Sequence, residues 1–116
     1  MMDWLKETFE KQVQLQQKVK NVKTDVELPN TIDMYGAATG MIIEIGEMLQ
    51  CDTRWKKEIT HSKKEPVYNY SQFMEEMADV FIYFMNVAIY SGVNIDTLKR
   101  FIIKKQDIVK ERFNDK

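Results

Sequence analysis

Residues 73–91 read FMEEMADVFIYFMNVAIYS, and this stretch decides the fold. Its apolar residues cover most of the circumference of a helix, which is typical of a helix buried on several sides. A cap at Asn69 or Ser71 and a stop at Gly92 set the limits of this helix. One polar stripe interrupts the apolar surface at steps of three and four residues. The stripe consists of Glu76, Asp79, Tyr83, Asn86 and Tyr90.

The segment from Thr31 to Cys51 repeats this design and predicts a second apolar helix. Glu44 and Glu47 lie three residues apart, so they share one face of it. Apolar side chains lie on both flanks of these acids. Most of them form one apolar side of the helix, and Ile43 lies across from that side. The flanking residues are Ala38, Met41, Ile42, Ile45, Met48 and Leu49.

The rest of the chain adds two amphipathic helices and one polar loop. The apolar spacing predicts a first helix over 3–22, and Asn94 caps a last helix that ends near Phe113. The segment 52–70 is polar and contains Pro66, so we expect a loop with a short helix around 53–59. No stretch alternates as a β-strand does. The sequence therefore predicts one all-α domain over residues 1–116, a bundle of four to five helices.

Composition excludes several classes of protein. The 17 basic and 18 acidic residues give a net charge of −1, which argues against a binder of nucleic acid polymers. The longest apolar run, 80–90, is well short of the ~18 residues of a membrane span, and the N-terminal segment lacks an apolar signal core. We therefore expect a cytoplasmic protein that does not bind membranes. Cys51 and His61 cannot form a zinc pattern; we interpret Cys51 as a packing residue rather than a nucleophile paired with His61.

The two acid pairs carry the functional argument. If the two apolar helices face each other, Glu44, Glu47, Glu76 and Asp79 are brought into a low-dielectric environment. Clustered carboxylates there raise one another's pKa, and their burial is costly unless a cation neutralises them. Mg²⁺ prefers carboxylate oxygens and commonly shares its shell with a phosphate. We therefore expect these four acids to be Mg²⁺ ligands, with Mn²⁺ as an alternative ion.

Two other interpretations of the acids compete with this one. They can form a solvated helix face, although their continuous apolar flanks argue against it. A di-iron carboxylate bundle also uses Glu on facing helices, but it needs Glu-x-x-His pairs. His61 is the only histidine and lies in the predicted loop, so we set this interpretation aside.

The acid pairs resemble a known signature. Glu44-Ile-Gly-Glu47, followed after 28 residues by Glu76-Met-Ala-Asp79, is similar to the E-x-x-E and E-x-x-D motifs of the all-α nucleoside triphosphate pyrophosphohydrolases. That superfamily contains the MazG-like enzymes, the dimeric dUTPases, the dCTP pyrophosphatases and phosphoribosyl-ATP pyrophosphohydrolase. The resemblance covers roughly residues 41 to 96 and is strongest to the dimeric dUTPases.

Further elements of the chain resemble the substrate-binding motifs of those dUTPases. FEKQVQLQQKV is similar to their first motif, which implies that Gln12 contacts the base. The RWKK segment implies roles for Trp55 and Lys56, and Asn86 matches a small polar residue that faces the nucleotide. KKQDIVKER is similar to their closing motif and implies that Lys105 and Arg112 contact phosphates. The chain departs from the pattern at Val109, where the family has asparagine, and this leaves the nucleotide open.

The resemblance implies Mg²⁺-dependent hydrolysis of a nucleoside triphosphate to the monophosphate and pyrophosphate, with dUTP as the first substrate to consider. It implies metal-ligand roles for Glu44, Glu76 and Asp79, and the role of ligand or general base for Glu47. A MazG-like enzyme acting on dCTP or another nucleotide is the second hypothesis. A helical interaction module without chemistry is the third.

Surface area predicts assembly. A compact chain of this mass exposes roughly 6,600 Å², and four helices cannot cover two helices that are apolar on more than one side. Large exposed apolar patches mark interfaces. We therefore expect a homodimer or homotetramer whose active sites are lined or closed by a neighbouring chain.

Overall fold

The computed structural model of the chain describes residues 3–20, 30–54, 56 and 65–114. These residues form helices and no β-strand, which confirms the all-α class; an isolated antiparallel bridge joins Asp52 and Tyr68. The helices are α1 (Trp4–Lys20), α2 (Thr31–Gln50), α4 (Tyr70–Tyr90) and α5 (Ile95–Asn114).

Asparagine side chains begin three of these helices. The Oδ1 atoms of Asn30, Asn69 and Asn94 each accept a hydrogen bond from the backbone N–H three residues later, at 3.0–3.1 Å. Such a bond satisfies one of the backbone donors that a helix start leaves unpaired. Asn69 is thus the cap of α4, rather than Ser71. After α4, Gly92 has a φ of 73°, a left-handed conformation that suits glycine at a helix end.

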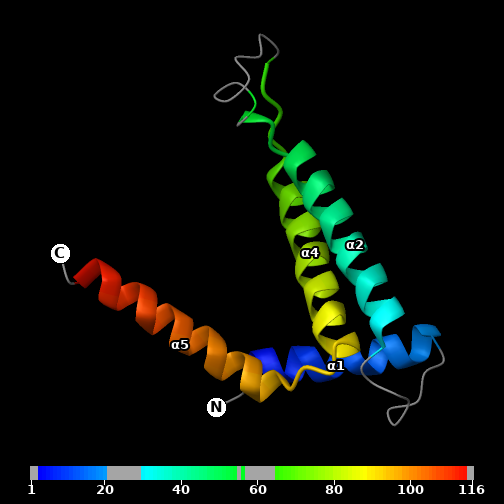
Figure 1. Cartoon of the computed structure of the whole chain (residues 1–116). Helices are drawn as coiled ribbons and strands as arrows, with labels where there is room; N and C mark the ends of the chain where they lie inside the picture. Colours follow the sequence, from blue (N-terminus) through cyan, green and yellow to red (C-terminus); the bar gives the residue numbers. More distant parts are fainter. Residues whose placement is uncertain (1–2, 21–29, 55, 57–64, 115–116) are drawn as a thin grey trace.

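Helices α2 and α4 form an antiparallel hairpin (Figure 1). At its open end the Asn30 N–H donates to the carbonyl of Tyr90 at 2.7 Å, and at its closed end the Asn69 N–H donates to the carbonyl of Cys51 at 2.8 Å. We call the line of contact between α2 and α4 the seam. Midway along it, Gly40 allows the ring of Tyr83 to lie directly against the α2 backbone. These contacts fix which residues of the two helices lie opposite each other.

A short clasp closes the upper end of the hairpin. The Thr53 N–H donates to the carbonyl of Val67 at 2.7 Å, and the Val67 N–H donates to the Thr53 hydroxyl at 2.7 Å. Arg54 donates from Nε and Nη2 to the two oxygens of Asp52, at 2.8 and 2.7 Å. Its guanidinium also lies over the ring of Tyr68, 3.8 Å from the centroid. The clasp fixes where α2 ends relative to the start of α4.

Helix α1 crosses the other end of the hairpin, where the buried core lies (Figure 1). The core residues are Phe9, Met85, Ala88 and Ile89, with Val13, Phe81 and Ile95 packed against them. The indole of Trp4 stacks on Phe81 with ring centroids 5.9 Å apart. The core therefore holds α1 to the C-terminal half of α4.

Helix α5 is attached near its N-terminal end and then runs away from the hairpin (Figure 1). The Lys99 ammonium pairs with Asp3 at 2.8 Å, and Lys6 pairs with Asp96 at 3.8 Å. The radius of gyration is 17.9 Å, whereas a compact domain of this length has about 13 Å. A helical bundle fits the α2–α4 hairpin with α1 across its end, but α5 does not fold back onto it.

Two predicted elements lie partly outside the described residues. The first helix was expected over 3–22, and α1 is described as far as Lys20. The short helix expected around 53–59 falls mostly on residues that the structure does not describe; within it, Arg54 and Lys56 have helical backbone. Over the described residues, no single helix has the length and hydropathy to cross a membrane. Only α4 and α5 taken together, across a bend of 119°, meet that criterion.

The close approach at Gly40 generates the first prediction. The Cβ of an alanine at Gly40 would clash with the edge of the Tyr83 ring at Cε1 and Cδ1, whereas the Cβ of an alanine at Gly46 meets no atom within 4 Å. Gly46→Ala should raise the free energy of unfolding by up to about 1 kcal/mol through helix propensity. Gly40→Ala should lower it by about 1–3 kcal/mol because the seam is overpacked. Urea denaturation followed by circular dichroism measures both; equal stabilisation by the two variants contradicts this packing.

Candidate functional site

Three of the four predicted acids converge on one point of the seam. Glu44 and Glu47 project from α2 and Glu76 from α4, and each offers a carboxylate oxygen within 4.8 Å of the other two. Asp79 lies one turn along α4 from Glu76 and is exposed. It is outside this group of three, but its charge also acts on Glu44. Glu75, the neighbour of Glu76, is exposed and outside the group as well.

The electrostatics of this cluster are unfavourable as it stands. Glu44 Oε2 and Glu76 Oε2 are buried, and no described residue donates a hydrogen bond to either atom. A hydrogen bond with Glu76 raises the pKa of Glu44 to about 7, with further increases from desolvation and from the charges of Glu47, Asp79 and Glu76. Glu44 therefore holds a proton well above the ordinary pKa of a glutamate.

The cluster fits a hard divalent cation. All of its donor atoms are carboxylate oxygens, which Mg²⁺ and Mn²⁺ prefer over softer ligands. The two buried oxygens without a donor are the atoms that a cation would satisfy. Glu44, Glu47 and Glu76 are thus the residues that could hold the metal, and Asp79 lies one turn further along α4.

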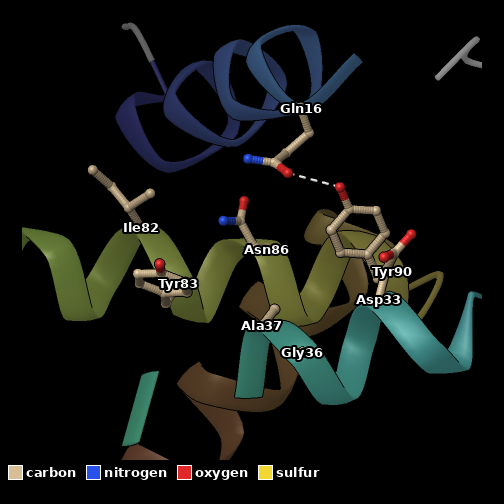
Figure 2. Close-up of a pocket in the computed structure, with 8 residues that line it drawn as sticks. All are labelled: Gln16, Asp33, Gly36, Ala37, Ile82, Tyr83, Asn86 and Tyr90. Carbon is tan, nitrogen blue, oxygen red and sulfur yellow. Dashed lines mark hydrogen bonds between the residues drawn. The ribbon is translucent and has the colours of Figure 1, made fainter. Parts of the chain in front are cut away.

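A cavity of about 430 Å³ lies along the seam toward α1 (Figure 2). Its polar lining comes from Gln16, Asp33, Tyr83, Asn86 and Tyr90, and Gly36, Ala37 and Ile82 complete the wall. The Tyr90 hydroxyl donates to Gln16 Oε1 at 2.7 Å and joins α4 to α1. This mixture of polar groups and apolar wall is typical of a small-molecule site.

Two predicted substrate-binding residues, Gln12 and Asn86, contact each other beside this cavity. Gln12 Nε2 donates to Asn86 Oδ1 at 2.9 Å, and both residues are buried. This bond leaves the amide N–H groups of Asn86 and the carbonyl of Gln12 for other partners. The pair can therefore present a donor and an acceptor to a bound molecule.

A second cavity, of about 460 Å³, lies on the other side of the acids, toward the clasp. It is lined by Glu47 and Glu76 together with Gln50, Cys51, Val67, Asn69 and Gln72. Lys56 Nζ lies 3.5 Å from Gln50 Oε1, so this predicted substrate-binding residue is near the acid end of the hairpin. Desolvation, followed by the charges of Glu76 and Glu47, raises the pKa of the Cys51 thiol. Cys51 is therefore protonated at neutral pH, which favours its interpretation as a packing residue.

The other predicted cationic contacts are not brought to the acids within one chain. Lys105 and Arg112 lie on α5, which runs away from the hairpin, and both are exposed (Figure 1). Arg54 is engaged by Asp52 and Tyr68 in the clasp. Trp55 lies outside the described residues.

Sequence reasoning missed two polar residues of the first cavity. Gln16 lies one turn after Gln12, so the helical period of α1 places both on one face. Asp33 lies about three turns before Glu44, and the spacing 33, 37, 40, 44 and 47 defines one face of α2. Extending each predicted face along its helix would have found both residues.

Comparison with known proteins gives no match: no protein family, curated protein sequence or solved structure is significantly similar to the chain.

The raised pKa of Glu44 generates a prediction about stability. Between 4.5, the ordinary pKa, and about 7, the folded chain holds a proton that the unfolded chain releases. Without divalent cations, the free energy of unfolding should therefore fall as pH rises through this window. Glu44→Gln should remove that slope, and Glu75→Gln should keep it. Urea denaturation at a series of pH values measures the slope; a wild-type slope of the opposite sign contradicts the raised pKa.

Proposed function

We propose that this chain hydrolyses a nucleoside triphosphate, with dUTP the first candidate, to the monophosphate and pyrophosphate with the help of Mg²⁺. One observation supports this most: three carboxylates meet across the α2–α4 seam, and two of their buried oxygens lack a hydrogen-bond donor. A cation and an attached polyphosphate relieve this arrangement. The proposal places the chain in a bundle of the all-α pyrophosphohydrolase type.

The spacing along α4 suits a nucleotide. Tyr83 and Asn86 line the first cavity, and Glu76 lies seven residues before Tyr83. Seven residues of helix span about 10 Å, which is on the scale of a sugar with its first phosphates. A nucleoside in the cavity, with its base edge toward Gln12 and Asn86, would direct its phosphates along α4, past Tyr83, toward the acids.

Glu44, Glu76 and Asp79 would hold the metal in this proposal, and Glu47 would accept the proton of the attacking water. Of the three clustered acids, Glu47 is exposed, whereas Glu44 and Glu76 are partly buried, so Glu47 has the freest access to solvent within the cluster. It also borders the second cavity, through which water can enter. When bound, Mg²⁺ supplies charge for the phosphate oxygens and lowers the pKa of a bound water.

Cationic side chains would stabilise the charge that develops on the phosphates. Lys56 is the candidate within the same hairpin because it lies beside Gln50 at the rim of the second cavity. Lys105 and Arg112 can act on these phosphates only from a neighbouring chain, because their own α5 runs away from the acids.

Two alternatives remain within this proposal. A MazG-like enzyme would use the same acids on dCTP or a non-standard nucleotide. The polar groups that line the cavity are compatible with each of these bases. A non-catalytic interaction module would keep the bundle and leave the acids in mutual repulsion.

The central test is pyrophosphate release from dUTP. Wild-type protein with Mg²⁺ should turn over, and EDTA should abolish the reaction. Glu47→Gln should lower kcat by about 10²–10⁴-fold because a general base is lost. Glu75→Gln, a matched change on the neighbouring exposed side chain, should leave kcat unchanged.

A panel of triphosphates under the same assay separates the alternatives. Preference for dCTP or a modified nucleotide favours the MazG-like enzyme. If no triphosphate is cleaved, and Asp79→Asn raises the unfolding temperature, the chain is an interaction module and the proposal is wrong.

The contact between Gln12 and Asn86 generates a prediction about affinity. Gln12→Ala removes one base contact and leaves Asn86 without its partner, at about 1–3 kcal/mol. The KM for the preferred nucleotide should therefore rise about 10-fold to 100-fold. Gln14→Ala changes an exposed residue on the same helix and should alter neither KM nor kcat. Equal KM values for the two variants would show that the base lies elsewhere.

A further inference from the structure

We infer that Gln16 is a further base-binding residue and that Tyr90 is the residue that positions it. The Tyr90 hydroxyl holds the side-chain amide of Gln16 in one orientation, with its N–H₂ group toward the first cavity. In that orientation Gln16 donates a hydrogen bond to an acceptor atom, such as a carbonyl oxygen, on the base of a nucleotide. These roles rest on the proposed function in one respect, namely that the molecule in the cavity is a nucleotide.

Tyr90 is fixed in place at the end of α4. It is only 4% exposed, and its backbone carbonyl accepts a hydrogen bond from the Asn30 N–H at 2.7 Å. A buried tyrosine hydroxyl needs a hydrogen-bond partner, and this hydroxyl donates to Gln16 Oε1 on α1. The buried ring therefore sets the position of the hydroxyl, and the more flexible side chain of Gln16 turns to meet it.

The length of this hydrogen bond indicates which end of the Gln16 amide faces Tyr90. The two bonded atoms are 2.7 Å apart, which is typical of an O–H···O bond, whereas N–H···O bonds are usually about 2.9–3.0 Å long. The carbonyl oxygen of Gln16 therefore faces Tyr90, and the amide nitrogen points away from it (Figure 2). Among the described residues, Gln16 makes no other hydrogen bond, so its N–H₂ group is left for a ligand.

Asn86 repeats this arrangement in the wall of the same cavity. Its carbonyl oxygen accepts a hydrogen bond from Gln12 at 2.9 Å, as the carbonyl oxygen of Gln16 does from Tyr90. A side-chain amide carries both donors and an acceptor, so its residue type alone is compatible with any base. Here both carbonyl oxygens are engaged by bonds between α1 and α4, and both amides present their N–H₂ groups. These two amides therefore select acceptor atoms on the ligand.

The position of Gln16 along the hairpin places it beside the base rather than the phosphates. Asn86 and Tyr90 lie beyond Tyr83 on α4, on the side away from Glu76. In the proposed function the acids hold the metal and the phosphates, so the opposite end of the nucleotide lies at these residues. The apolar wall of the cavity there suits the face of an aromatic ring.

The base contact is tested by nucleotide binding without turnover. Titration calorimetry of the full chain with dUMP and with dCMP, in the presence of Mg²⁺, gives a Kd for each, and the tighter-binding nucleotide is used for the variants. Gln16→Glu replaces the N–H₂ donor with a carboxylate oxygen and should raise Kd at least about 10-fold. Gln14→Glu makes the same change on an exposed residue of α1 and should leave Kd unchanged.

The positioning role of Tyr90 is tested by a double-mutant cycle. Tyr90→Phe frees the Gln16 amide to rotate and should raise Kd about 3-fold to 10-fold. Tyr70→Phe makes the same change on α4 at a residue that is 61% exposed, and it should leave Kd unchanged. In a Gln16→Ala background, Tyr90→Phe should change Kd by less than about 2-fold, because its effect passes through Gln16. A tyrosine with a merely structural role would weaken binding in both backgrounds.

Circular dichroism reports whether each variant keeps its helices. If Tyr90→Phe loses them, Gln16→Glu against Gln14→Glu still tests the base contact. Four results would overturn these roles. They are equal Kd values for Gln16→Glu and Gln14→Glu, a wild-type Kd for a folded Tyr90→Phe variant, an effect of Tyr90→Phe that persists in the Gln16→Ala background, and no binding of either nucleotide at millimolar concentration.

Failure of these roles is distinct from failure of the proposed function. If dUTP is cleaved but Tyr90→Phe binds and reacts as wild type does, only the roles of Tyr90 and Gln16 are wrong. If Kd changes as expected but no triphosphate is cleaved, the base contact stands and the proposed hydrolysis is wrong.

Discussion

The structure depends on how closely α2 and α4 can approach while acids lie between them. Gly40 lets the Tyr83 ring reach the α2 backbone, and this contact draws the two helices together. The same approach brings Glu44 against Glu76 and leaves buried carboxylate oxygens without donors. Tight packing in the middle of the seam and electrostatic repulsion next to it are therefore two results of one geometry. A cation bound by the acids would relieve the repulsion without loosening the packing.

Local sequence signals predicted the helices because they act over a few residues. The asparagine caps and Gly92 set the helix limits, and the polar stripe on residues 76–90 set the orientation of α4. The position of α5 could not be predicted in this way. Its apolar stripe is equally compatible with packing on its own hairpin and with packing on another chain. The pairing of Lys99 with Asp3 holds the start of α5 near that of α1 across 96 residues of sequence, and no local pattern reveals it.

In the candidate site too, some contacts could be predicted from local sequence signals and others could not. The acids at 44, 47 and 76 share helix faces, so their convergence follows from the helical period once α2 and α4 are paired. The contact between Gln12 and Asn86 spans 74 residues and depends on how α1 crosses the hairpin. The contacts of the Arg54 guanidinium with the Asp52 carboxylate and the Tyr68 ring depend on the course of the chain between α2 and α4. Spacing gives no information about either contact.

Because of the clasp at the end of the hairpin, the relative positions of the acids do not depend on the sequence that joins the two helices. Thr53 and Val67, together with Cys51 and Asn69, hold the two ends of that connection in a short ladder. Insertions, deletions or exchanges between residues 57 and 64 can therefore accumulate without shifting Glu47 relative to Glu76. The fold is thus suited to diversification, because the sequence that joins the two helices can vary in length and charge while the acidic cluster keeps its register.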